Sequence, residues 1–85
     1  MSKFADDLVC KIKEKRGFFK KIQSGIEGEG IKIVKHGNGA LLSLIDVEIN
    51  DEYIPTTYSD RLKLERAVTW WIRTVSLSYL QHNTI

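Results

Sequence analysis

The sequence predicts an α+β fold: a two-layer sandwich of an N-terminal helix, an antiparallel β-hairpin or three-stranded sheet, and a long C-terminal helix. Three observations predict it. Apolar residues recur at helical spacing near both ends of the chain, and in the middle runs of β-branched residues flank an Asn-Gly pair. The 85 residues are 42% hydrophobic and 28% charged, which suits a single globular domain over residues 1–85.

The N-terminal helix is expected to run from Ser2, which caps its first turn, to about Ser24. Its apolar face consists of residues that recur at helical spacing: Phe4, Leu8, Ile12, Phe19 and Ile22. Because this face stays in phase across Gly17, a continuous helix is favoured, although a glycine inside a helix costs about 1 kcal/mol. The alternative is a helix that stops at Gly17, with residues 18–23 forming a short strand or a second helical turn.

The middle of the chain is expected to form a β-hairpin after a glycine-rich loop over residues 25–30. Residues 31–35 and 40–50 are the two strands. Asn38-Gly39 between them favours a type I′ turn, because this turn needs positive φ at both central residues. On the second strand, alternation places Leu41, Ile45, Val47 and Ile49 on the core face and Leu42, Leu44, Asp46 and Glu48 on the other.

The last helix is expected to begin after a polar segment over residues 50–55, where Thr57 and Asp60 have the spacing of a capping box. No glycine or proline interrupts it before about Gln81. Its length of about 36 Å then exceeds the width of about 30 Å expected of a domain this size. Its core stripe is Leu64, Val68, Trp71, Ile72, Val75 and Tyr79. Trp71 is therefore predicted to be a core residue.

The neighbouring Trp70 is rotated about 100° from Trp71 around the helix and falls on its far side. Four residues lie with it or border it there: Lys63, Arg66, Arg73 and Leu77. An exposed tryptophan flanked by arginines is typical of a binding hot spot, so we expect a protein-binding surface here. Three alternatives stay open: self-association as a homodimer, a different protein partner, or cover by the chain's own N-terminal segment or tail.

Charge is segregated along the chain: residues 1–24 carry a net +4, residues 25–60 a net −5 and residues 61–85 a net +3. The N-terminal basic set is Lys11, Lys13, Arg16, Lys20 and Lys21, with Phe18 and Phe19 among them. Cations that follow a phosphate backbone beside rings that stack on bases make nucleic-acid binding the alternative function. Against it, the net charge is only +2, and ion pairing between segments explains the pattern equally well.

The sequence holds few residues suited to catalysis or metal binding. His36 and His82 form no recognisable pattern with a nucleophile, and Cys10 falls on the polar side of the first helix. One cysteine and two distant histidines do not supply the ligands of a zinc site. The alternating acidic residues between 46 and 52 lack the spacing of an EF-hand loop. We therefore expect no enzyme activity, no metal site and no cofactor.

A single cysteine favours a reducing compartment, and the N-terminal segment lacks the apolar core of a signal peptide or membrane span. We expect a cytoplasmic protein with no membrane partner. The biased composition, rich in lysine and isoleucine and poor in proline, is typical of a low-GC bacterium or its phages. The expected function is that of a small non-catalytic interaction module, such as a phage accessory protein. It would act as an adaptor or inhibitor of a larger protein through the exposed face of the last helix.

Overall fold

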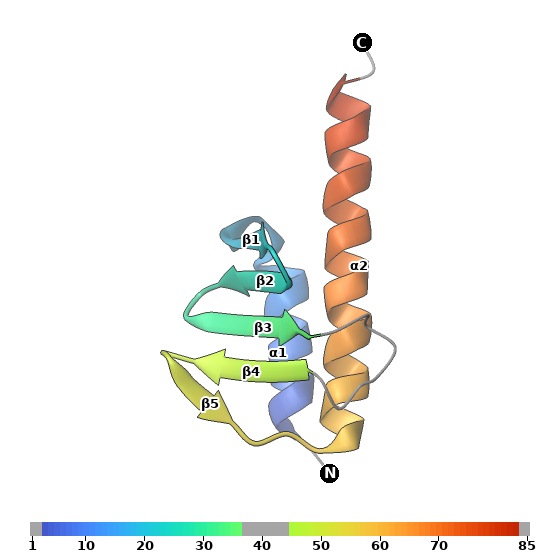
Figure 1. Cartoon of the computed structure of the whole chain (residues 1–85). Coiled ribbons are helices and arrows are strands. Elements are labelled where there is room, and N and C mark those ends of the chain that lie inside the picture. The colour runs from blue at the N-terminus through green and yellow to red at the C-terminus, as the bar shows by residue number, and fades with distance from the viewer. Residues whose placement is uncertain (1–2, 37–44, 84–85) are drawn as a thin grey trace.

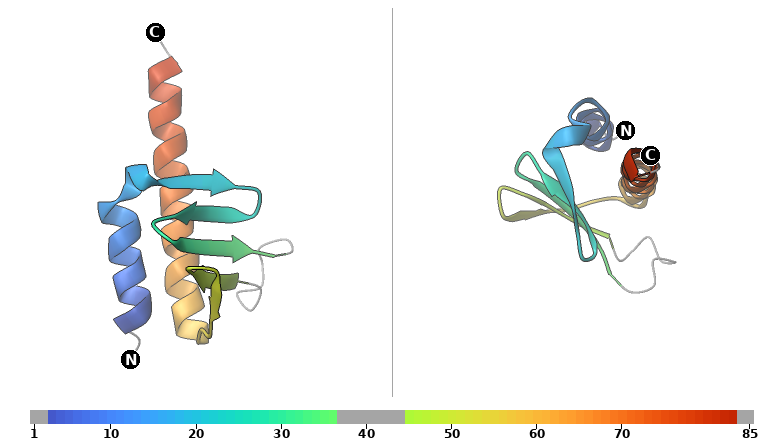
Figure 2. Two further views of the ribbon diagram at one scale, coloured as in Figure 1. Left: turned by 90° about the vertical axis from the view of Figure 1, so that its left-hand side faces the viewer. Right: turned by 90° about the horizontal axis from the view of Figure 1, so that it is seen from above.

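The computed structural model describes residues 3–36 and 45–83, with the side chains of residues 3–36 and 45–75. The described strands form one antiparallel sheet in the order β1-β2-β3-β4-β5, and both helices pack on the same face of it (Figure 1, Figure 2). In chain order the elements are α1 (Lys3–Glu14), the 3-10 turn η1 (Arg16–Phe18), β1 (Phe19–Ile22), β2 (Gly25–Gly28), β3 (Ile31–Lys35), β4 (Ile45–Ile49), β5 (Glu52–Ile54) and α2 (Tyr58–Asn83). The predicted α+β class is confirmed, with a larger sheet than expected.

The first helix is shorter than the sequence predicts. It ends just before Lys15, whose amide donates a hydrogen bond to the Lys11 carbonyl oxygen at 2.8 Å. Lys15 then leaves helical geometry, with φ −111° and ψ 39°, and the chain turns through η1 into β1. The predicted apolar face is confirmed within α1, where Leu8 and Ile12 are buried. The prediction of a continuous helix through Gly17 is wrong.

Phe19 belongs to a strand although it is in helical phase with α1. It is the first residue of β1, and its ring is buried in the same core as Ile12. The turn between them is closed by the Phe18 amide, which donates to the Lys15 carbonyl oxygen at 2.9 Å. A helix followed by a tight turn thus places both apolar side chains in one core. Periodicity alone does not distinguish this arrangement from a continuous helix.

The glycines at residues 25 and 28 lie in a strand, β2, so the prediction of a loop over residues 25–30 is wrong for this part. Glycine in a strand often marks a close approach of another backbone. A Cβ atom at Gly25 would collide with the carbonyl oxygen of Ile33, and one at Gly28 would collide with that of Phe18. Ile26 between the two glycines is fully buried, so β2 contributes directly to the core.

Two-residue turns with positive φ join two of the strand pairs. Glu29 and Gly30 between β2 and β3 have φ of 52° and 74°, and Asn50 and Asp51 between β4 and β5 have φ of 52° and 69°. Positive φ at both central residues is the requirement of a type I′ hairpin turn. β5 therefore forms within the polar segment of residues 50–55 and extends the sheet beyond the predicted hairpin.

The predicted antiparallel pairing of β3 with β4 is confirmed, and Lys35 pairs with Ile45 at its open end. Asn38-Gly39, the predicted type I′ turn, lies outside the described residues. An uninterrupted ladder from a two-residue turn at 38–39 would pair Lys35 with residue 42. The observed register therefore places three more residues in this connection than such a ladder allows.

The two faces of β4 follow the predicted alternation. Ile45 and Val47 are buried toward the helices and Ile49 is half-buried with them. Asp46 and Glu48 alternate with these residues and face the open side of the sheet. The other residues assigned to these faces lie outside the described part of the chain: Leu41, Leu42 and Leu44.

The last helix begins with the predicted capping box. The Thr57 amide donates to Asp60 Oδ2 at 3.0 Å, and the Asp60 amide donates to Thr57 Oγ1 at 3.1 Å. α2 then runs for 26 residues and extends well beyond the sheet and α1 (Figure 1). Of its predicted core stripe, Leu64, Val68 and Trp71 are buried and Ile72 and Val75 are half-buried. The side chain of Tyr79 lies outside the described part.

The close contact at Gly25 gives a direct test of β2. Gly25→Ala should lower the free energy of unfolding by about 2–4 kcal/mol, because a clash with a backbone carbonyl cannot be relieved by rotating a side chain. Gly17→Ala is the matched control, since a Cβ there meets no other atom within 4 Å. It should change stability by about 1 kcal/mol or less. Urea unfolding measures both, and equal effects would contradict the strand assignment.

Candidate functional site

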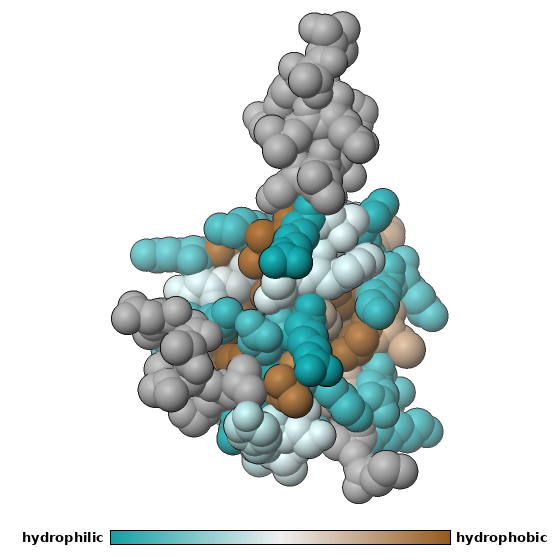
Figure 3. All heavy atoms as spheres, turned by 90° about the vertical axis from the view of Figure 1, so that its right-hand side faces the viewer, coloured by the Kyte–Doolittle hydropathy of each residue, from teal (hydrophilic) through white to brown (hydrophobic). Residues whose placement is uncertain are grey.

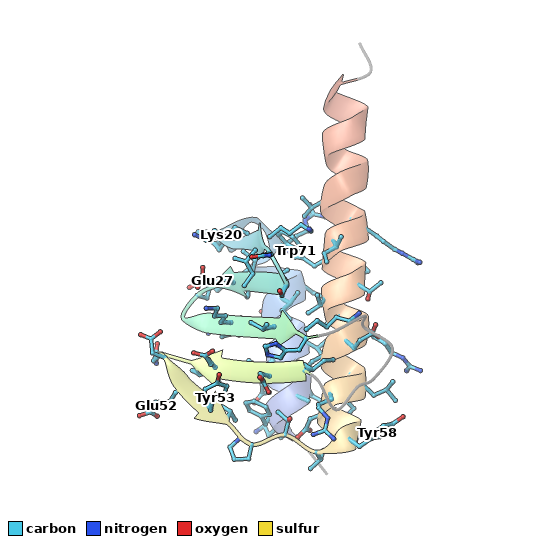
Figure 4. The ribbon with its side chains drawn as sticks, viewed as in Figure 1. Lys20, Glu27, Glu52, Tyr53, Tyr58 and Trp71 are labelled. Carbon is cyan, nitrogen blue, oxygen red and sulfur yellow. The ribbon has the colours of Figure 1, made fainter. Side chains whose placement is uncertain are left out.

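The two adjacent tryptophans of α2 lie in different environments. Trp71 is 3% exposed and packs in the core, as predicted. Its indole Nε1–H donates a hydrogen bond to the backbone carbonyl oxygen of Arg16 at 3.0 Å, and Figure 4 shows it between α2 and the end of the sheet at β1. This contact ties the last helix to the turn that joins α1 to the sheet.

Trp70 is half-buried and lies at the junction of α2 with α1. The Lys13 ammonium nitrogen of α1 lies 5.8 Å from the centroid of the Trp70 ring, within the range of a cation–π contact. α1 therefore covers one side of the indole, and the remainder is accessible. The alternative in which the N-terminal segment covers Trp70 holds for that side only.

A hollow of about 290 Å³ runs along the junction of the two helices. We call it the Trp70 groove, and it is lined by Asp6, Val9, Lys13, Lys63, Arg66, Ala67 and Trp70. Asp6 Oδ1 accepts a hydrogen bond from Lys63 Nζ at 2.9 Å. Lys13 lies seven residues after Asp6 on α1, Trp70 lies seven residues after Lys63 on α2, and the cation–π contact joins Lys13 to Trp70. The two helices therefore run in the same direction along the groove.

A second hollow of about 300 Å³ lies on the other side of the Trp70 ring. Its lining residues are Glu65, Arg66, Thr69, Trp70, Arg73 and Thr74. Arg66 and Trp70 line both hollows, so the indole forms a ridge between them. We call the two hollows together the Trp70 surface. Figure 3 shows patches of hydrophobic surface between hydrophilic side chains on the side of the molecule where α2 lies.

The Trp70 surface carries unbalanced positive charge. Three of its cations form no ion pair with an acidic group among the residues that the structure describes: Lys13, Arg66 and Arg73. Its two acidic residues are already paired, Asp6 with Lys63 at 2.9 Å and Glu65 with Lys35 at 3.3 Å. The three cations are therefore available to a negatively charged partner.

Four of the five residues predicted to bind protein line the Trp70 surface: Lys63, Arg66, Trp70 and Arg73. The fifth, Leu77, lies in α2, and its side chain is outside the described part. Sequence reasoning missed the contribution of α1, namely Asp6, Val9 and Lys13. The available signal was their three- and four-residue spacing on the flank of the apolar stripe, since the flanks of two packed helices meet along a groove.

The basic residues predicted to bind nucleic acid do not share one helical face. Lys11 and Lys13 lie on α1, Arg16 lies on η1, and Lys20 and Lys21 lie on β1. On the predicted continuous helix, Lys13, Arg16 and Lys20 would share one side, and this expectation is wrong because α1 ends before Arg16. Lys20 instead approaches an acidic group across the β1–β2 pair, with its Nζ 3.6 Å from Oε1 of Glu27 (Figure 4).

The two phenylalanines proposed to stack on bases differ in exposure. Phe19 is buried, whereas Phe18 is 70% exposed. The Lys15 ammonium nitrogen lies 5.5 Å from the centroid of the Phe18 ring, and 3.8 Å from a carboxylate oxygen of Glu29. At the end of the sheet where β1 lies, a small aromatic and basic corner consists of Lys15, Arg16 and Phe18. We call it the Phe18 corner.

His36 and Asp46 form a histidine–carboxylate pair on the sheet. Nε2 of His36 lies 2.8 Å from Oδ2 of Asp46, and the two side chains are 53% and 42% exposed. Cys10 is exposed on α1, as predicted, and the side chain of His82 lies outside the described part. Within residues 3–36 and 45–75, no three His, Cys, Asp or Glu side chains gather as metal ligands. The exposed pair has the character of a surface hydrogen bond.

Comparison of the chain with protein-family models, with curated proteins and with solved structures gives no match. Over the described residues, neither helix combines the length and the apolar character needed to cross a membrane. The function is therefore argued from the geometry and charge of the surfaces described above.

Substitution of each tryptophan should separate their roles. Trp71→Ala should lower the free energy of unfolding by about 3–5 kcal/mol, because it empties a buried site and removes the partner of a carbonyl group. Trp70→Ala should cost about 1–2 kcal/mol, since part of the ring is already in water and one cation–π contact is lost. Urea unfolding followed by circular dichroism measures both. Losses of the same size would contradict the assignment of Trp71 alone to the core.

Proposed function

We propose that this chain is a small non-catalytic protein-interaction module that binds a larger cytoplasmic protein through the Trp70 surface, as an adaptor or inhibitor. One observation carries the proposal. The Trp70 ring stands between two hollows and is bordered by three cations that have no ion-pair partner in the described part of the chain. Tryptophan and arginine are the residue types most enriched at the energetic centres of protein interfaces. A partner that fills both hollows would enclose the indole and pair with the cations.

The shape of the Trp70 surface favours a protein over a small molecule. Small-molecule sites enclose most of the ligand within a single cleft. Here two open hollows of about 290 and 300 Å³ lie on either side of one ring. Lys13 and α1 hold that ring from one side, so less side-chain freedom is lost when a partner covers it. α2 also continues beyond the rest of the domain, so a partner that lies along it gains further contact area (Figure 1).

Affinity capture with the immobilised full chain tests this function. In an extract of the cell or phage host that the sequence comes from, the parent chain should retain a protein that Trp70→Ala and Arg66→Glu each reduce by about tenfold or more. Quantitative mass spectrometry of the captured proteins is the measurement. Arg66 is exposed, so its substitution tests the surface independently of any effect of Trp70→Ala on folding.

Tyr53→Ala is the matched control for the capture experiment. Tyr53 is 70% exposed and lies on the open face of the sheet, away from α2 (Figure 4). The variant should capture the same protein as the parent. Undiminished capture of the partner by both Trp70→Ala and Arg66→Glu, or loss of its capture with Tyr53→Ala, would contradict the assignment of the Trp70 surface.

Nucleic-acid binding is the second candidate function, and one observation favours it. Phe18 is 70% exposed beside Lys15 and Arg16, and an exposed ring among cations is the arrangement on which single-stranded nucleic acids stack. The adjacent open face of the sheet is less favourable. Its cross-strand row alternates in charge from β1 to β4: Lys20, Glu27, Lys32 and Glu48. Phosphates would meet carboxylates along that row, so protein binding is better supported.

A labelled single-stranded oligonucleotide tests the second candidate. If the Phe18 corner binds nucleic acid, affinity measured by fluorescence anisotropy should fall with rising salt. Phe18→Ala and Arg16→Glu should each weaken binding by about tenfold, because they remove a stacking platform and reverse a charge of the corner. Trp70→Ala should leave it unchanged. Binding without salt dependence, or absence of binding, would eliminate this candidate.

A further inference from the structure

We infer that the segment which occupies the Trp70 groove is an acidic amphipathic helix of a different protein. The inference rests on the proposed function and adds to it the shape and charge of the partner. Three properties of the groove carry it: the spacing of its residues along two parallel helices, its apolar floor, and the cations on its rim.

The spacing of the groove residues suits a helix. The contacts that Lys63 and Trp70 make with α1 are seven residues apart on α2, about 10.5 Å along the helix axis. Arg73, which lines the adjoining second hollow, lies seven residues beyond Arg66 of the groove, so the two arginines have the same repeat. A helix laid lengthwise in a groove contacts it through residues at i, i+3 or i+4, and i+7. A partner helix therefore meets these positions, seven residues apart on α2, with its own residues two turns apart.

The floor of the groove requires an apolar stripe on that helix. Val9 of α1 and Trp70 of α2 are half-buried and pack against the core from either side. Ala67 lines the same groove with a short side chain, which leaves room for a larger apolar side chain of the partner. Burial of this floor stabilises a complex by about 25 cal/mol per Å² of apolar surface removed from water. An acidic segment without an apolar stripe would forgo that gain.

The rim of the groove selects the charge of the helix. Lys13 and Arg66 line the groove, and Arg73 lines the second hollow that adjoins it at Trp70. None of the three cations has an acidic partner in the described part of the chain. Carboxylates at i and i+7 of a partner helix match the spacing of the two arginines, whose guanidinium groups bind carboxylates through paired hydrogen bonds. A basic helix would place like charges together, which costs binding energy and lowers the association rate.

A second copy of this chain fits the groove poorly. A two-fold dimer sets the same patch of both copies face to face, so Lys13, Arg66 and Arg73 would meet the same three cations. The open face of the sheet carries the acidic residues Asp46 and Glu48, with Lys32 directly across from Glu48. Its docking into the groove of another copy would be a head-to-tail contact, which does not close into a dimer.

Synthetic peptides titrated into the full chain test the inference. Three labelled peptides of equal length are compared by fluorescence anisotropy: an amphipathic helix with glutamate on its polar face, the same helix with lysine there, and a scrambled glutamate peptide without an apolar stripe. The glutamate helix should bind about tenfold or more tightly than the other two, and more weakly as salt rises. Trp70→Ala and Arg66→Glu should each weaken it by about tenfold, and Tyr53→Ala should not.

Equal binding of the scrambled peptide would show that charge alone attracts the partner, and equal binding of the lysine helix would show that the cations do not select it. Either result overturns the inference, as does displacement of the glutamate helix by a single-stranded oligonucleotide. Absence of glutamate-helix binding alongside Trp70-dependent capture of a protein overturns the inference and leaves the proposed function intact. Capture that survives Trp70→Ala and Arg66→Glu removes both.

Discussion

The packing and hydrogen bond of Trp71 hold together parts of this domain that are distant in the sequence. Its indole lies in the core shared by α1, the sheet and α2, and its Nε1–H binds the Arg16 carbonyl oxygen, 55 residues away in the chain. Arg16 lies where the first helix gives way to the sheet, so this bond fixes the position of α1 against α2. In an 85-residue chain, which builds only a small core, one buried tryptophan is a large part of the stabilising contact.

The position of Trp70 follows from that of Trp71. Adjacent residues of a helix point about 100° apart, so when one ring faces the core, the next lies on the flank of the helix. That flank meets α1, and the Lys13 ammonium comes to lie over the Trp70 ring. The same helix thus completes the core with one tryptophan and presents the other between two hollows. Because Lys13, Arg66 and Arg73 lack acidic partners in the described part of the chain, this flank is suited to contact with another molecule.

Features with a local cause could be predicted from the sequence, and features with a tertiary cause could not. The capping box at Thr57 and the phase of α2 depend on residues within a few positions, and both are confirmed. Phe19 keeps helical phase with α1 but lies in β1, because contacts with the rest of the fold stabilise the intervening turn. Gly25 is typical of a loop, and only the close approach of β3 shows why a strand needs it. The residues that α2 contributes to the Trp70 surface could be predicted from the helical spacing, whereas the position of Lys13 beside Trp70 depends on how α1 packs against α2.

The two indole N–H signals in a nitrogen–proton correlation spectrum test the division of roles between the tryptophans most directly. In the free chain, the buried and hydrogen-bonded Trp71 Nε1–H should exchange slowly with solvent, and the Trp70 signal should exchange quickly. When the captured partner is added, the Trp70 signal should shift and the Trp71 signal should stay in place. A Trp70 signal that does not move while amides on the open face of the sheet shift would contradict the account.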